Sequence, residues 1–162
     1  MKTLFLIRHA HSSRDDPRLA DSNRPLDDRG RRDAATMAGR LAARGVRPDS
    51  IISSPAVRAL TTARIFAEAL GFPPGTIAVE RRLYAAEAET VIGVIRAADD
   101  TQQTLMLFGH NPEFTDVARR LGAAFDHLPT CAVAEFDYER ATWSTVGIDR
   151  PVRTALDHPK TG

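Results

Sequence analysis

Residues 3–12 read TLFLIRHAHS, a short apolar run that leads directly into an Arg-His-Ala-His segment. The run Thr3–Ile7 has no alternation with polar residues, which is typical of a strand covered on both faces of a sheet. A second run of this kind, Thr104–Phe108 (TLMLF), also leads into a histidine, through Gly109-His110. We therefore expect two buried strands, each with a histidine just beyond its carboxyl end.

The rest of the chain alternates between helical and extended patterns. Four amphipathic segments predict helices at Arg29–Arg44, Pro55–Leu70, Ala88–Ala98 and Pro112–Leu121. Ser54 and Asn111 are the expected N-caps of the second and fourth helices, followed by Pro55 and Pro112 as first helical residues. Weaker patterns predict four more strands, the last two as a closing hairpin, at Ser50–Ile52, Ile77–Val79, Cys131–Tyr138 and Thr142–Val146. This alternation predicts an α/β fold with three α/β/α layers and a mostly parallel sheet with helices on both faces.

Length and composition indicate a single globular domain over residues 1–162, with an irregular tail from about Asp149. Hydrophobic residues make up 43% of the chain and the net charge is +1, so no dominant basic face predicts a nucleic-acid partner. The opening apolar run is too short for a signal peptide or a membrane span, which predicts a cytoplasmic protein without a membrane partner. The only cysteine, Cys131, excludes an internal disulfide and disfavours a thiolate zinc site.

Basic and imidazole side chains follow three of the predicted strands. Arg8 and His9 come after the first strand, Arg58 lies one turn into the helix that follows the second, and His110 comes after TLMLF. Ligands of open α/β sheets bind beyond the carboxyl ends of the strands, so these side chains are expected to meet there. Arginine forks and helix N-termini both favour anions. The sequence therefore predicts a phosphate site at this edge of the sheet.

Three of these segments resemble signature segments of the histidine phosphatase superfamily, which includes the phosphoglycerate mutases: Arg8-His9-Ala10, Ser53–Ala63 and Gly109-His110-Asn111-Pro112. The stretches Arg24-Pro25-Leu26-x-x-Arg29-Gly30 and Leu83-Tyr84-x-Ala86 are most similar to its phosphohistidine phosphatase branch, the SixA-like proteins. The resemblance covers nearly the whole chain. It implies a phosphoglycerate mutase-like fold and a phosphatase that uses neither a metal ion nor another cofactor.

The resemblance also implies a role for each matching residue. His9 would attack phosphorus and become phosphorylated, and water would then release phosphate. Ser12 or Ser13 would add a neutral hydrogen bond to the substrate. Charge on the phosphoryl oxygens would be stabilised by the catalytic groups Arg8, Arg58 and a protonated His110.

One departure from the family pattern affects the expected substrate. The mutases carry a proton-donating glutamate two residues after a leucine that matches Leu83, and this chain has Ala85 there. Glu87 is the candidate substitute. A missing acid would slow the departure of an alkoxide most, because its conjugate acid has a pKa of about 16. It would matter far less for imidazole, whose pKa is about 6.5, so a phosphohistidine on another protein is the expected substrate, with the loop Ser12–Asp28 as contact surface.

The same residues are also compatible with other functions. With Glu87 as acid, the chain would be a broad phosphomonoesterase acting on small phosphorylated metabolites. A phosphate-recognising binding module without turnover is a second alternative. His9-x-His11 together with His110 could instead ligate a metal ion, although the neighbouring arginines would repel a cation.

Overall fold

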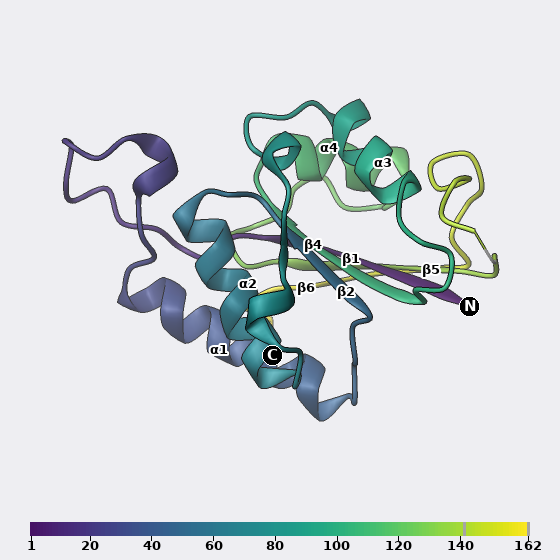
Figure 1. The fold of residues 1–162 in the computed structure, drawn as a ribbon, viewed down its shortest axis with the longest axis horizontal. Coiled ribbons are helices and arrows are strands. Elements are labelled where there is room, and N and C mark those ends of the chain that lie inside the picture. Colours follow the sequence, from purple (N-terminus) through teal and green to yellow (C-terminus); the bar gives the residue numbers. More distant parts are fainter. Residues whose placement is uncertain (141, 162) are drawn as a thin grey trace.

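A six-stranded sheet in the order β3-β2-β4-β1-β5-β6 forms the centre of the molecule (Figure 1). The structure is a computed structural model and describes residues 1–140 and 142–161. The strands are β1 (Lys2–Arg8), β2 (Ser50–Ser53), β3 (Ala78–Val79), β4 (Thr104–Gly109), β5 (Val133–Tyr138) and β6 (Arg153–Asp157). The first four are mutually parallel, whereas β5 runs antiparallel to β1, and β6 pairs antiparallel with β5 at the edge of the sheet. The predicted α/β fold with a mostly parallel sheet is confirmed.

Helices cover both faces of this sheet, as Figure 1 shows, with α1 and α2 on one side and α3 and α4 on the other. The α-helices are α1 (Asp28–Ala43), α2 (Val57–Ala69), α3 (Ala88–Arg96) and α4 (Glu113–Arg120). Three short 3₁₀ helices join them to the strands: η1 (Asp21–Asn23), η2 (Pro74–Thr76) and η3 (Arg81–Leu83). The longest helix, α1, has 16 residues, and in the described chain no helix meets the length and apolarity needed to span a membrane.

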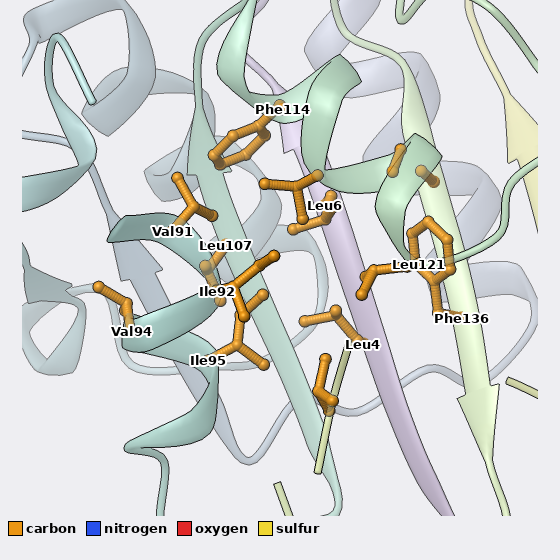
Figure 2. Packing of buried hydrophobic residues seen from close by; sticks show 14 of the residues in the cluster. Leu4, Leu6, Val91, Ile92, Val94, Ile95, Leu107, Phe114, Leu121 and Phe136 are labelled. Atoms are coloured by element: carbon orange, nitrogen blue, oxygen red, sulfur yellow. The ribbon is translucent and has the colours of Figure 1, made fainter. Parts of the chain in front are cut away.

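Burial on both faces explains why β1 is apolar without alternation. Leu4 and Leu6 point to the α3 and α4 side, where Figure 2 shows them among Val91, Ile92, Ile95 and Leu121. Phe5 and Ile7 belong to the second core, beneath α1 and α2. The neighbouring strand divides in the same way: Leu105 and Leu107 lie in the first core, Met106 and Phe108 in the second. The two apolar runs are therefore the central strands of the sheet.

The predicted closing hairpin is wrong in its second strand. Residues 142–146 form bends and turns, and β5 pairs instead with β6, inside the segment that was expected to be an irregular tail. Trp143 is fully buried, and its indole Nε1 donates to the Gln102 carbonyl at 2.9 Å. The apolar residues of 142–146 thus pack at the end of the sheet, whereas β6 is a half-exposed edge strand. Such a strand needs no apolar alternation, so the sequence pattern did not reveal it.

The predicted helix starts are also shifted. Ala56, not Ser54, is the N-cap of α2, and Pro55 precedes the helix. The Ser54 hydroxyl oxygen instead accepts from the Ala56 amide at 3.2 Å. Pro112 is the N-cap of α4, although the Asn111 side chain still accepts from the amide of Thr115 at 3.2 Å. Both polar residues therefore hold turns at the edge of the sheet.

Gly30 offers a direct test of how α1 is held against the loop beyond β1. A Cβ at this position would lie 2.0 Å from the backbone oxygen of His11, and neither backbone can move aside cheaply. We expect Gly30→Ala to lower the free energy of unfolding by about 3 kcal/mol, the upper range for overpacking. Gly39 lies exposed in the same helix with nothing within 4 Å, so Gly39→Ala should raise stability by about 0.5–1 kcal/mol. Urea unfolding of both variants checks the pair, and equal effects would contradict the predicted contact.

Candidate active site

A cavity of about 340 Å³ opens at the carboxyl ends of β1, β2 and β4. The segment between β1 and α1 supplies a large part of its wall, and in Figure 1 this segment extends away from the sheet. Five residues predicted for the site line this cavity together: Arg8, His9, Ser12, Arg58 and His110. The other lining residues are His11, Arg14, Asp21, Arg24, Asn111 and Thr130.

One ring nitrogen of His9 forms a hydrogen bond with the backbone. Its Nδ1 lies 2.7 Å from the backbone oxygen of Ala10. A carbonyl only accepts, so Nδ1 carries the proton and Nε2 keeps its lone pair. The amide of Ala10 donates to the Thr62 hydroxyl at 3.1 Å, and this hydroxyl donates to the Arg58 carbonyl at 2.7 Å. The loop that carries His9 is thereby attached to α2 at the helical turn that carries Arg58.

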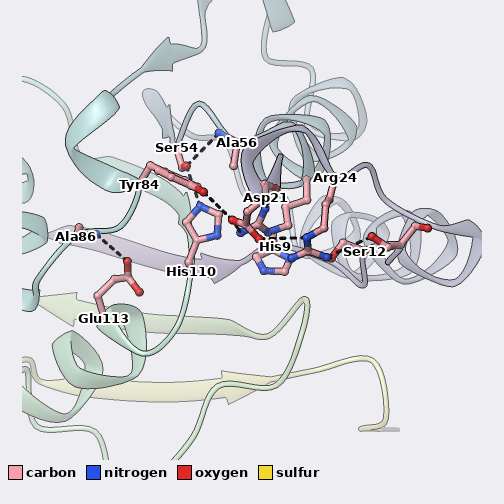
Figure 3. Close-up of polar contacts among 12 residues, drawn as sticks. His9, Ser12, Asp21, Arg24, Ser54, Ala56, Tyr84, Ala86, His110 and Glu113 are labelled. Atoms are coloured by element: carbon pink, nitrogen blue, oxygen red, sulfur yellow. Dashed lines mark hydrogen bonds and ion pairs between the residues drawn. The ribbon is translucent and has the colours of Figure 1, made fainter. Parts of the chain in front are cut away.

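His110 faces His9 across the cavity, with ring centroids 5.2 Å apart (Figure 3). Its Nε2 lies 2.8 Å from the hydroxyl oxygen of Ser54, at the end of β2. Its Nδ1 is buried and has no hydrogen-bond partner among the described residues. The Tyr84 ring packs against it in an edge-to-face arrangement, with centroids 5.6 Å apart.

Both arginines are anchored by part of the guanidinium and leave another nitrogen unpartnered. Arg8 donates through Nη1 to the Leu128 carbonyl at 3.0 Å. Arg58 donates to the backbone oxygen of Asp21 at 2.7 Å and to its carboxylate at 3.0 Å. The Nε atoms of Arg8 and Arg58 are buried without an acceptor within the described chain. A buried N–H without a partner is costly, so these groups mark a place for an acceptor.

The two histidines are neutral near pH 7 in this environment. Burial lowers the pKa of His9 to about 3; the hydrogen bond with the Ala10 carbonyl opposes this, whereas His110 and the two arginines add to it. Burial and the charge of Arg58 lower the pKa of His110 to about 4. The expected protonated His110 is therefore not the form of this structure, and a dianion in the cavity would have to raise its pKa. A neutral His9 is the nucleophilic form.

The tautomer and charge of His9 can be measured directly. We expect ring ¹⁵N chemical shifts of a neutral Nδ1–H imidazole at pH 7, unchanged as the pH falls through the ordinary histidine pKa of about 6.5. Because the pKa of His9 is lowered, its ring stays neutral at pH values where an ordinary histidine is already protonated. Protonation of this ring near pH 6.5 would contradict the burial seen here.

Asp21 and Arg24 belong to the site but were not predicted as site residues. The Asp21 carboxylate accepts from Arg58, from Arg24 at 3.1 Å and from the Tyr84 hydroxyl at 2.6 Å. The Tyr84 and arginine contacts hold the pKa of Asp21 well below its usual range. Arg24 also donates to the Ser12 hydroxyl at 2.8 Å. Both residues lie in the loop Ser12–Asp28, which was expected as a contact surface, and Arg24 begins the stretch that resembles the SixA-like branch.

A second cavity of about 370 Å³ adjoins the first and shares four of its lining residues, Asp21, Arg58, His110 and Asn111. Its other walls are Pro112, Glu113 and the turn Tyr84–Ala86. Glu87, the candidate proton donor, is the N-cap residue of α3 and lines neither cavity. Ser13 also lies outside both, and its hydroxyl accepts from the Asp15 amide. Glu113, which was not predicted as a site residue, lines the second cavity, and its carboxyl group accepts from the Ala86 amide.

The alternative of a metal site has little geometric support. The Nδ1 of His11 pairs with the carboxylate of Asp27, on the side of the loop that faces α1. Within residues 1–140 and 142–161, no group of three or more His, Cys, Asp or Glu side chains is arranged to hold a metal ion. The arrangement suits an anion instead, with a free imidazole nitrogen beside cationic N–H donors.

Comparison with known proteins adds a family to this geometry. The model of the histidine phosphatase superfamily (branch 1) matches residues 4–132. An uncharacterized chloroplast protein of Arabidopsis thaliana is 34% identical over 143 residues, which are 82% of this chain but only 65% of the plant protein. An uncharacterized protein of Mycobacterium tuberculosis is 37% identical over 112 residues, 69% of this chain and 67% of that protein.

Solved structures share the fold over almost the full chain. The SixA protein of Agrobacterium tumefaciens is 27% identical and superposes with a TM-score of 0.79, covering 95% of this chain and 97% of that one. A protein histidine phosphatase SixA complexed with tungstate has the same TM-score at 21% identity, with 97% of each chain covered. A mycobacterial glucosyl-3-phosphoglycerate phosphatase shares the fold at 17% identity and a TM-score of 0.64, with 98% of each chain covered.

Proposed function

The chain belongs to the histidine phosphatase superfamily, and on that premise we propose that it is a metal-independent phosphatase acting through a phosphohistidine on His9. One observation carries the proposal. The unprotonated Nε2 of His9 lines the same cavity as three residues with buried, unpartnered nitrogens, Arg8, Arg58 and His110. A phosphoryl group there would supply the acceptors that these nitrogens lack and would lie within reach of the nucleophile.

The reaction has two displacements at phosphorus. Nε2 of His9 forms a bond to phosphorus while the bond to the leaving group breaks, and the leaving group departs with the electron pair. Water then attacks the phosphorus of phospho-His9, the P–N bond breaks, and neutral His9 and inorganic phosphate result. In both steps Arg8 and Arg58 stabilise the charge on the equatorial oxygens. The dianion raises the pKa of His110, which then donates from Nδ1.

The substrate class that we propose is a phosphohistidine on another protein. Ala85 stands where relatives carry a proton donor, and an imidazole that is protonated on its other nitrogen leaves without one. The segment between β1 and α1 contributes Ser12, Arg14, Asp21 and Arg24 to the cavity wall, so a partner protein would meet it first. The likeness to the SixA structures supports the same substrate class.

A substrate panel tests this proposal. We expect kcat/KM for a phosphohistidine carrier protein to exceed that for alkyl and sugar phosphates, and activity to be unchanged in chelator. If alkyl phosphates are hydrolysed far faster than phosphohistidine, the result would favour the broad phosphomonoesterase instead. Phosphate-dependent binding without turnover of any donor would favour a binding module. Activity that vanished in chelator and returned with zinc or magnesium would contradict the metal-independent mechanism.

A further inference from the structure

Glu113 is a buried acid at the edge of the proposed phosphate site. It is the first residue of α4, three residues after His110, and only 4% of it is exposed. It lines the second cavity together with Arg58 and His110, which also line the cavity of the proposed phosphoryl site. Apart from Glu113, no glutamate of the described residues, Glu87 included, lines either cavity.

The contact with Ala86 holds this carboxyl group in place. Oε2 of Glu113 accepts from the Ala86 amide at 3.1 Å, as Figure 3 shows, next to His110 and Tyr84. Ala85 and Ala86 form the turn after η3, which is where the proton donor was expected from the sequence. The turn itself has no carboxyl group, and α4 places one against it.

The two carboxyl groups of these cavities have opposite environments. Asp21 accepts hydrogen bonds from two arginines and from Tyr84, which keeps it ionised and unable to donate a proton. Burial raises the pKa of Glu113, and the neighbouring Asp116 raises it further, whereas the Ala86 amide and the charge of Arg58 lower it. Two carboxyl groups whose pKa values are shifted apart are the usual arrangement of an acid beside an ionised partner.

We propose that Glu113 is the proton donor to the leaving group, which extends the reaction to phosphate monoesters of poor leaving groups. This inference rests on the proposed attack by His9. As the P–O bond breaks, the departing oxygen takes the proton of the Glu113 carboxyl group, and the alcohol leaves neutral. The resulting carboxylate then takes a proton from the water that attacks phospho-His9, which restores the acid. The second cavity is accordingly the place of the alcohol portion of the substrate.

The dependence on the leaving group distinguishes this role from a structural one. General acid catalysis contributes about 10²–10⁴-fold, and most for the most basic leaving groups. We expect Glu113→Gln to lower kcat/KM about 100-fold or more for glycerol phosphate. For phenyl phosphate, whose leaving group has a pKa of about 10, the loss should be smaller. Hydrolysis of 4-nitrophenyl phosphate and of phosphohistidine protein should change by less than about threefold.

Controls separate the outcomes. Glutamine keeps the oxygen that accepts from Ala86, and the reaction with 4-nitrophenyl phosphate reports whether the variant is folded. Glu87→Gln, a surface change outside both cavities, should leave all substrates unaffected. In the wild type, kcat/KM for glycerol phosphate should fall as Glu113 ionises, at a pH above the ordinary carboxyl range. Other titratable or charged groups also face or flank Glu113, namely Arg58, His110, Tyr84 and Asp116. The decrease in kcat/KM at higher pH is therefore assigned to Glu113 only if Glu113→Gln removes it.

Three results would overturn the proposal. The first is an equal loss on every substrate, which indicates a structural role. The second is no loss on glycerol phosphate. The third is a wild-type protein that forms phospho-His9 but turns over no alkyl phosphate. Failure to form phospho-His9 with any donor would instead refute the proposed function itself.

Discussion

Replacing His9 with alanine is expected to lower kcat/KM for every phosphoryl donor by at least about 10⁴-fold, the range seen when a covalent nucleophile is removed. The reason is geometric. Within the two cavities, His9 is the residue whose Nδ1–H is bound to a carbonyl while Nε2 stays unprotonated. Brief exposure of the wild type to a ³²P-labelled donor, followed by denaturation in alkali, should trap label on His9. The variant should trap none.

A matched control is available in His127, which is exposed and lies outside the cavity. His127→Ala should retain both label and turnover. Label that persists in His9→Ala, or that maps to His110, would assign the nucleophile to the opposite ring. Because the two rings lie 5.2 Å apart, peptide mapping of the label is needed to distinguish them.

Replacing Arg58 with alanine is expected to lower kcat/KM about 10²–10³-fold, the usual cost of removing one preorganised donor to a developing charge. Its side chain is only 7% exposed, so its charge is poorly screened by water. Arg58→Lys should recover part of the loss, since it restores the charge but not the fork. The affinity for tungstate, measured as an inhibition constant, should weaken in the same order.

Asp21 is the control for an indirect effect, because it accepts two hydrogen bonds from Arg58. If Arg58 acted only through its ion pair with the Asp21 carboxylate, Asp21→Ala would reproduce the loss seen in Arg58→Ala. We expect a clearly smaller loss, with tungstate affinity largely retained. Equal losses in the two variants would contradict direct phosphate binding by Arg58.

Much of the site followed from the sequence because its residues sit next to strong strand signals. The runs before Arg8 and His110 are apolar on both faces and could only be central strands. Parallel strands end at the same edge of a sheet, so the residues after them had to converge. The expected meeting of Arg8, His9, Arg58 and His110 required no knowledge of loops.

Residues carried by irregular segments could not be predicted in this way. Asp21 lies in the loop between β1 and α1, whose path depends on contacts such as the Ser12–Leu26 bridge and the pairing of His11 with Asp27. The strand β6 is an edge strand held by backbone pairing to β5, so its side chains carry no period. In both cases the determining interactions join residues distant in sequence.

The amino-acid sequence by itself determined the parallel strands of the sheet, the layers of helices around it and the convergence of Arg8, His9, Arg58 and His110 at one edge. The apolar pattern of a strand and the residues that follow it are local properties of the sequence. They determine the sheet because apolar runs must be buried between the helix layers. Only the tertiary structure decided that Asp21 occupies the Arg58 fork and that Glu113 lies beside the turn at Ala86. The charge of each group was decided there too, because a pKa depends on burial and on neighbours from other elements, which no single segment contains.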